Sequence, residues 1–154
     1  MCKTLSFVLA AFLSEAVVFA ADNDYVVTVN KGDADVVWRS VDEAGPAALL
    51  ADGVKDRRLV KRGEGRLIIE CDLQTPGYAG AILVEKGYLR LRNDGACGTS
   101  AGGVTVCSGA TLEGDPSYKS GSLLFTNEPL TFEGFGVDGV EGAVPFYDRL
   151  TLSF

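Results

Sequence analysis

Apolar and polar residues alternate in short runs along most of the chain. Residues 88–91 are Tyr-Leu-Arg-Leu, and residues 104–106 are Val-Thr-Val. A period of two is typical of a β-strand with one buried and one solvated face. Helical periodicity is nearly absent: only residues 42–50 could carry a helical turn or two, and we expect Gly45-Pro46 to disrupt it.

The strand pattern repeats along the chain. Residues 65–69 match residues 87–91 at an offset of 22, and residues 111–114 match residues 131–134 at an offset of 20. Each repeat is too short for a propeller blade, which needs about 40 residues, and it has no helical half. We therefore predict an all-β fold, a right-handed parallel β-helix (a solenoid) with coils of about 20–23 residues.

Stacked coils place equivalent residues in ladders. One inner ladder is expected to contain Leu67, Leu89, Leu112, Phe132 and Leu152, and a second to begin with Ile69 and Leu91. Aromatic layers toward the C-terminal end are expected from Phe125, Phe135, Phe146 and Tyr147, and outward contacts from Arg90, Arg92, Thr105, Glu113 and Glu133. At an offset of 22 Leu89 aligns with Thr111, so one extra residue must widen the corner between Gly109 and Leu112.

Residues 1–20 have the pattern of a signal peptide. Lys3 is followed by an apolar run, and Val18 and Ala20 are small enough for cleavage before Ala21. An uncleaved membrane anchor is the alternative, but Ser14-Glu15 interrupts the run. We expect residues 21–58 to form an N-terminal capping coil with strands over 25–29 and 36–38. Residues 59–154 would form the β-helix repeats, and since the last repeat is broken, the chain would be either truncated or self-associating.

Three strings of residues resemble the autotransporter-associated β-strand repeat family. Residues 59–67 resemble its Leu-x-Lys-x-Gly-x-Gly-x-Leu opening, residues 78–89 resemble its continuation, and residues 98–112 resemble the coil that follows. The similarity covers about residues 59–144. It implies a bacterial surface or secreted passenger built as a parallel β-helix, and it supplies no catalytic residues. Family members often end in a translocator barrel, and this chain shows no series of lipid-facing strands after the repeats.

The net charge of the chain limits the classes of molecule that it can bind, and its cysteine content limits the disulfides that it can form. The formal net charge of −7 makes the chain a poor ligand for nucleic acid. A basic cluster contains Lys55, Arg57, Arg58, Lys61, Arg62 and Arg66. We interpret it as the solvated entry to the first repeat strand, with contact to an acidic polysaccharide or a membrane surface as the alternative. Cys71, Cys97 and Cys107 remain after cleavage; Cys97 and Cys107 are the first choice if a disulfide forms, and otherwise each cysteine fills a small site.

The sequence does not fit the usual patterns of catalytic or metal-binding sites. The chain has no His, which excludes Ser-His-Asp systems and His-ligated metals. Residues 134–139 match Gly-x-Gly-x-x-Gly, but no helix should begin there to bind a dinucleotide. The same stretch partly resembles a calcium-binding nonapeptide, and one copy supplies too few oxygens. We therefore expect no catalytic, cofactor-binding or metal-binding residues.

The sequence favours a non-catalytic, exported surface or passenger segment that acts as a scaffold or adhesin. Its ligand is unknown; carbohydrate and protein both fit, and self-association through the open C-terminal coil is a further expectation. One alternative is a β-helix lyase or hydrolase acting on acidic polysaccharide, with Asp33 and Asp35 on one strand face, Asp42 beside Glu43, and Trp38 stacked on a sugar. Another is a nonfunctional fragment of a longer autotransporter-like protein. Trp38 could instead belong to the core of the capping coil.

Overall fold

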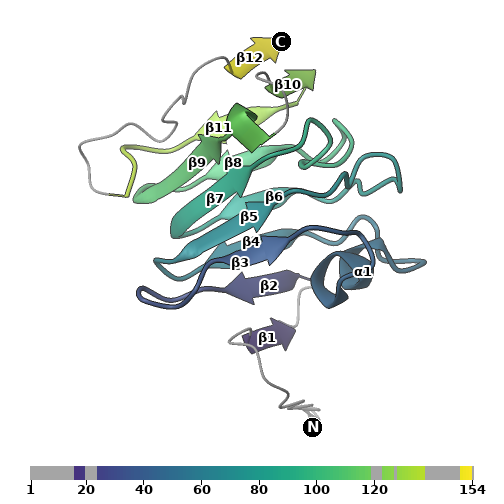
Figure 1. Cartoon of the computed structure of the whole chain (residues 1–154), viewed down its shortest axis with the longest axis horizontal. Coiled ribbons are helices and arrows are strands. Elements are labelled where there is room, and N and C mark those ends of the chain that lie inside the picture. Colours follow the sequence, from purple (N-terminus) through teal and green to yellow (C-terminus); the bar gives the residue numbers. More distant parts are fainter. Residues whose placement is uncertain (1–15, 20–23, 119–122, 127, 138–149, 154) are drawn as a thin grey trace, which may run out of the picture.

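The fold is dominated by parallel β-sheets (Figure 1). The structure, a computed structural model, describes residues 16–19, 24–118, 123–126, 128–137 and 150–153. The first sheet contains, in spatial order, β1 (Ala16–Phe19), β2 (Tyr25–Thr28), β4 (Leu59–Arg62), β6 (Ile82–Val84), β8 (Val104–Val106) and β11 (Leu130–Phe132). The second sheet contains β3 (Val36–Trp38), β5 (Arg66–Ile69), β7 (Gly87–Leu91) and β9 (Ala110–Gly114).

The chain visits the two sheets alternately from β2 to β9. Within each sheet, every strand from β2 to β8 pairs in parallel with the next strand of that sheet, as Leu59 does with Ile82 and Leu67 with Leu89. Among the strands of the described residues, only β1 pairs antiparallel, with β2. A short helix α1 (Ala44–Leu50), a 3-10 turn η1 (Pro116–Tyr118) and a small parallel sheet of β10 (Leu123–Thr126) with β12 (Leu150–Ser153) complete the described elements. The protein is therefore all-β in character, with parallel sheets.

The hydrophobic core draws on the facing sides of both sheets. The predicted inner ladder is confirmed for Leu67, Leu89 and Leu112, which pair in register across β5, β7 and β9 and are buried. Ile69 and Leu91 form the second ladder as expected, and both are buried. Burial of these side chains, each worth about 1.5–3 kcal/mol, is the main force holding successive repeats together.

The C-terminal part of the predicted ladder is wrong. Phe132 belongs to β11 and pairs with Val106 in the first sheet, and it is partly exposed. Leu152 pairs with Phe125 in the small sheet of β10 and β12. After β9 the chain passes through η1 and β10 before it returns to the first sheet, so the repeat at an offset of 20 joins strands of different sheets. Strand alternation is the same in both sheets and cannot distinguish them.

The predicted aromatic layers are confirmed only in part. Phe125 is buried in the core, but Phe135 is 73% exposed, so the expectation fails there. Phe146 and Tyr147 lie outside the described residues.

The corner before β9 is wider than the corner before β7, but the extra residue precedes Ala110 and does not lie between Gly109 and Leu112 as expected. Val84 pairs with Val106, whereas Gly87 pairs with Ala110. The segment between the paired positions therefore has one more residue at Gly109, which adopts a positive φ of 79°. The extra residue keeps Leu112 on the buried side of β9.

Helix α1 forms where the sequence predicted disruption. Pro46 lies in its first turn, where a backbone N–H has no intrahelical partner, so proline costs no hydrogen bond there. A Cβ on Gly45 would lie 2.6 Å from the indole of Trp38, so glycine is what lets the helix approach that ring. Trp38 is 2% exposed and meets Tyr25 edge-on at 6.3 Å between ring centroids. It is a core residue and presents no stacking surface to a sugar.

The Leu-x-Lys-x-Gly-x-Gly-x-Leu string has a physical explanation in the corner between β4 and β5. Lys61 is fully buried, and its Nζ donates to the carbonyl oxygens of Arg62 (2.9 Å), Gly63 (2.7 Å) and Lys86 (3.0 Å). Burial lowers the pKa of Lys61 to about 8. A Cβ on Gly63 would lie 2.3 Å from the Val29 carbonyl oxygen, so the turns of neighbouring repeats touch backbone to backbone. Lys61 thus supplies donors to corner carbonyls that strand pairing leaves open.

The predicted signal peptide lies mostly outside the described residues. Within it, Ala16–Phe19 forms β1 and continues the first sheet. In the described segments, no helix has the length and hydropathy needed to cross a bilayer.

Candidate functional site

The outer side of the second sheet carries a continuous chain of ion pairs. We call it the charged face; it consists of Asp35, Arg66, Glu70, Arg90, Arg92, Glu113 and Asp115. The closest nitrogen–oxygen distances are 3.5 Å for Arg66–Asp35, 3.0 Å for Arg66–Glu113, 2.7 Å for Arg90–Glu113, 4.0 Å for Arg90–Asp115, 2.9 Å for Arg92–Asp115 and 2.8 Å for Arg92–Glu70. Arg66 and Arg92 therefore each join carboxylates of two different repeats, while Arg90 pairs with two carboxylates of the β9 repeat.

Glu113 is the centre of the charged face. It was expected to offer an outward contact, and it is instead 2% exposed beneath two arginine side chains. Arg66 and Arg90 retain 26% and 20% of their side-chain exposure, so the arginines and not Glu113 meet solvent. The Arg66 guanidinium also lies 4.8 Å from the centre of the Tyr88 ring, a cation–π contact.

We expect Glu113→Gln to lower the free energy of unfolding by about 1–2 kcal/mol. The amide keeps the shape of the side chain but removes the charge that holds Arg66 and Arg90, each of which stays partly hydrated. Urea denaturation followed by circular dichroism measures the loss. Glu133→Gln is the matched control, since Glu133 is exposed in the same acidic part of the chain. Equal midpoints for both variants would show that the buried pairs contribute nothing.

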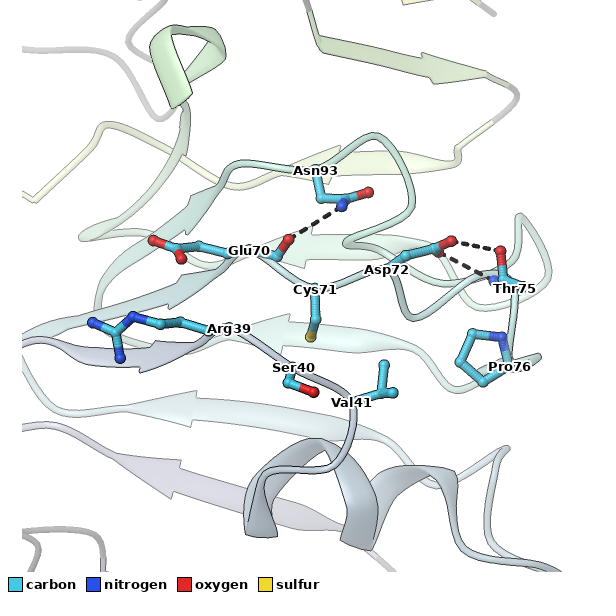
Figure 2. Close-up of a pocket in the computed structure, with 9 residues that line it drawn as sticks. All are labelled: Arg39, Ser40, Val41, Glu70, Cys71, Asp72, Thr75, Pro76 and Asn93. Atoms are coloured by element: carbon cyan, nitrogen blue, oxygen red, sulfur yellow. Dashed lines mark hydrogen bonds between the residues drawn. The ribbon is translucent and has the colours of Figure 1, made fainter. Parts of the chain in front are cut away.

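A shallow hollow lies where β3, β5 and β7 end (Figure 2). It measures about 520 Å³ and is lined by Arg39, Ser40, Val41, Glu70, Cys71, Asp72, Thr75, Pro76 and Asn93. Figure 2 shows the Glu70 and Arg39 side chains extending to one side, while Asp72 and Thr75 lie on the other. The Asp72 carboxylate accepts hydrogen bonds from the backbone N–H groups of Gln74 and Thr75, so it holds its own turn together.

The thiol in this hollow has low reactivity at neutral pH. Cys71 is buried, and burial raises its pKa to about 11, so at neutral pH it is protonated and a poor nucleophile. Cys97 and Cys107 are also free, and burial raises the pKa of both, that of Cys97 strongly. The disulfide considered between Cys97 and Cys107 is not formed.

A second depression follows the corners where β3, β5, β7 and β9 begin. We call it the corner groove; its volume is about 550 Å³, and it is lined by Lys31, Gly32, Asp33, Asp35, Glu64, Gly65, Arg66, Lys86, Tyr88, Gly109 and Val137. It borders the charged face, with which it shares Asp35 and Arg66. Its walls therefore come from the turns of four consecutive repeats.

The expectation that Asp33 and Asp35 share one strand face is wrong. Both precede β3 in the turn that follows β2, because Asn30, Lys31 and Gly32 form a tight turn there. The Asp33 carboxylate accepts a hydrogen bond from the Asn30 N–H at 2.9 Å, and Asp35 pairs with Arg66. The two residues nevertheless line the same groove. Asp42 and Glu43 lie apart from it, in the turn before α1.

The basic cluster of the sequence does not form a continuous patch. Arg58 pairs with Asp24 at 2.6 Å, Arg62 with Glu85 at 2.5 Å, and Lys55 donates to the Pro76 carbonyl at 2.9 Å. With Lys61 buried and Arg66 held on the charged face, these cations serve different internal contacts. The prediction of a solvated strand entry fails for Lys61 in particular.

Within the described ranges, no group of three or more His, Cys, Asp or Glu side chains is arranged to hold a metal ion. Two residues of the nonapeptide-like stretch, Asp138 and Val140, lie outside those ranges, as does Gly139 of the Gly-x-Gly-x-x-Gly match.

Glu128 predicts a pH dependence of stability. It is 8% exposed, and burial raises its pKa from 4.5 to about 7, partly offset by a backbone hydrogen bond from Gly103. Between these two pH values the unfolded chain releases a proton that the folded chain keeps. Stability therefore falls as the pH rises from about 4.5 to 7, by up to about 3 kcal/mol from this residue.

The check on this dependence is a set of urea denaturation curves from pH 4.5 to 8. Glu128→Gln cannot ionise, so its stability curve should be flatter over this range than that of the unaltered chain. Parallel curves for the two proteins would show that Glu128 is ionised normally in the fold.

Sequence analysis missed the charged face, although a signal was present. Glu70, Arg92 and Asp115 follow the strands β5, β7 and β9 at equivalent places, so opposite charges recur at steps of one repeat. The same holds for Arg90 and Glu113, which are paired in register. Comparing charges between repeats, as well as apolar residues, would have found it.

Comparisons with known proteins give no family for the chain. No protein-family model, no curated protein and no solved structure matches it.

Proposed function

We propose that this chain is a non-catalytic, exported scaffold or adhesin segment, and that its two parallel sheets are walls of a right-handed parallel β-helix. Support for the finer fold comes from the register. Strands β2 to β8 pair with equivalents one repeat on, and the chain alternates between the two sheets. The ladder of Leu67, Leu89 and Leu112 is what stacked coils would bury. We also retain membership of the autotransporter-associated β-strand repeat family as a proposal.

The observation that carries the functional proposal is the charged face. The buried carboxylates of Glu113 and Glu70 hold the three arginines of the charged face, Arg66, Arg90 and Arg92, in fixed positions on the outside of one sheet. Side chains held this way lose little conformational entropy when they meet a partner, which favours binding over chemistry. The Cys71 thiol, which lines the nearby hollow, is protonated at neutral pH and is therefore a poor nucleophile.

The export part of the proposal is tested on the source cells. Surface biotinylation followed by intact-mass measurement should find a labelled species that begins near Ala21. An unlabelled species inside the cell that retains residues 1–20 would overturn export and the signal peptide together.

The non-catalytic part needs a separate assay. Purified chain incubated with polygalacturonate or alginate should release neither reducing ends nor unsaturated uronates. Release that Asp33→Asn or Asp35→Asn abolishes would establish the polysaccharide-cleaving alternative instead.

A further inference from the structure

We propose that the corner groove is a binding site for a neutral, polyhydroxylated polymer, a polysaccharide chain that lies across the corners of successive repeats. This inference rests on the proposed binding function and gives that function a site and a ligand class.

The groove has room for a ligand because glycine forms its ends. A Cβ added to Gly32 or to Gly109 would meet no atom within 4 Å, so the space beside both residues is open. Gly65, which also lines the groove, is tightly packed: a Cβ there would lie 2.6 Å from the Asn30 carbonyl oxygen. The backbones of neighbouring turns therefore meet closely beside the charged side chains that line the groove.

The charges of the groove favour a neutral ligand. Three cations, Lys31, Arg66 and Lys86, are interspersed with three carboxylates, Asp33, Asp35 and Glu64, so the groove has no net charge although the chain carries −7. A polyanion or a polycation would meet repulsion from half of these groups. A hydroxyl group both donates and accepts, so vicinal hydroxyls can bond to a carboxylate and to a neighbouring ammonium group together.

The polar side chains are available at small cost. Lys86 and Glu64 are 3.4 Å apart and retain 63% and 48% of their side-chain exposure, so their pairing is weak and can be exchanged for hydrogen bonds to a ligand. Asp33 uses one oxygen for the Asn30 N–H, and that bond fixes the carboxylate. Hydrogen-bonding groups held in place before binding are the basis of specificity in a polar site.

Tyr88 adds an aromatic surface to the same wall. Its side chain is half-buried, and the Arg66 guanidinium over one side of the ring fixes its orientation. An aromatic ring beside charged hydrogen-bonding groups matches a sugar, which has both C–H surfaces and hydroxyls. Neighbouring strands of a sheet lie about 4.8 Å apart, a step similar to the length of one pyranose unit, so a polymer can meet one turn with each sugar.

The test is isothermal titration calorimetry of the full chain with three probes: cellohexaose, laminarihexaose and tetragalacturonate. We expect a neutral hexasaccharide to bind, and Lys86→Met and Tyr88→Ala each to weaken binding by about tenfold. Asp42→Asn and Arg39→Met, which change charges outside the groove, should leave the affinity unchanged. The Lys86 side chain is mostly exposed, so Lys86→Met should not disturb folding. This variant therefore tests the groove even if Tyr88→Ala fails to fold.

Three outcomes would overturn the proposal. The first is that no probe binds; the second is that neutral hexasaccharides bind equally well to the groove variants; the third is that only tetragalacturonate binds, with an affinity that falls steeply with salt. A chain labelled on the cell surface that binds none of the probes would refute the groove alone. A chain that binds through the groove but remains inside the cell would refute the exported function alone.

Discussion

Leu89→Asp is expected to lower the free energy of unfolding by about 4 kcal/mol or more. Leu89 is fully buried and sits in register between Leu67 and Leu112 in the ladder that joins three repeats. A carboxylate there would be removed from water with no cationic partner in the ladder. Single domains are typically stable by about 5–15 kcal/mol, so this variant should lose a large fraction of its stability. Urea denaturation monitored by circular dichroism measures the change.

The control is Thr105→Asp, which should cost less than about 1 kcal/mol. Thr105 is half-buried and lies between the buried residues Val104 and Val106, so its side chain points away from the core. Arg90→Asp, which strand alternation alone would suggest as the neutral variant, is unsuitable because it would place a carboxylate beside Glu113, now 2.7 Å from Arg90. Similar midpoints for Leu89→Asp and Thr105→Asp would contradict the arrangement of the core.

The inner ladder was predictable because burial and alternation act on the same residues. Each inward leucine of the second sheet is followed two residues later by another apolar or glycine position, and the glycine corners set the repeat length. Those local signals place β3, β5, β7 and β9 correctly. They could not place Phe132, because the detour through η1 and β10 changes the sheet that the chain returns to, and no period in the sequence marks that change.

Strand alternation also failed to predict which charged residues are buried in the fold. Lys61 occupies an inward position, between Val27 and Val84 in register, where alternation calls for an apolar side chain. Its aliphatic part can pack in the core while the ammonium group reaches the corner carbonyls. Glu113 occupies an outward position and is buried all the same, because Arg66 and Arg90 cover it. Both Glu113 arginines and one of the three carbonyl acceptors of Lys61, that of Lys86, lie in other repeats, which pattern analysis of a single strand does not consider.

The corner groove depends on turns, and turns were the least predictable part. The sequence reading expects Asp33 and Asp35 on one strand face, yet the turn at Gly32 places them at a corner. The groove exists because the corners of different repeats stack, so its walls come from residues spread between Lys31 and Val137. That stacking could be derived only once the register of the strands was known.

Gly80→Ala is expected to lower the free energy of unfolding by about 3 kcal/mol or more, even though the change adds one methyl group. A Cβ on Gly80 would lie 2.0 Å from the Arg57 carbonyl oxygen and 2.8 Å from the Tyr78 hydroxyl. That hydroxyl donates to the same carbonyl at 2.9 Å and accepts from the Leu59 N–H at 3.1 Å, so it joins two repeats at a buried corner. The methyl group must either separate the repeats or break this bridge, and rigid backbone cannot yield cheaply.

Gly77→Ala isolates this steric effect from ordinary backbone strain. Gly77 lies in the same loop with a positive φ of 88°, but a Cβ there would meet no atom within 4 Å. Gly77→Ala should lower the free energy of unfolding only by the strain of alanine in a left-handed conformation, about 1–2 kcal/mol. Gly102→Ala should behave like Gly80→Ala, because its Cβ would lie 2.1 Å from the Gly80 carbonyl oxygen in the preceding repeat. If thermal denaturation ranks Gly77→Ala as the most destabilising of the three, close stacking of the corners is not what holds the repeats in place.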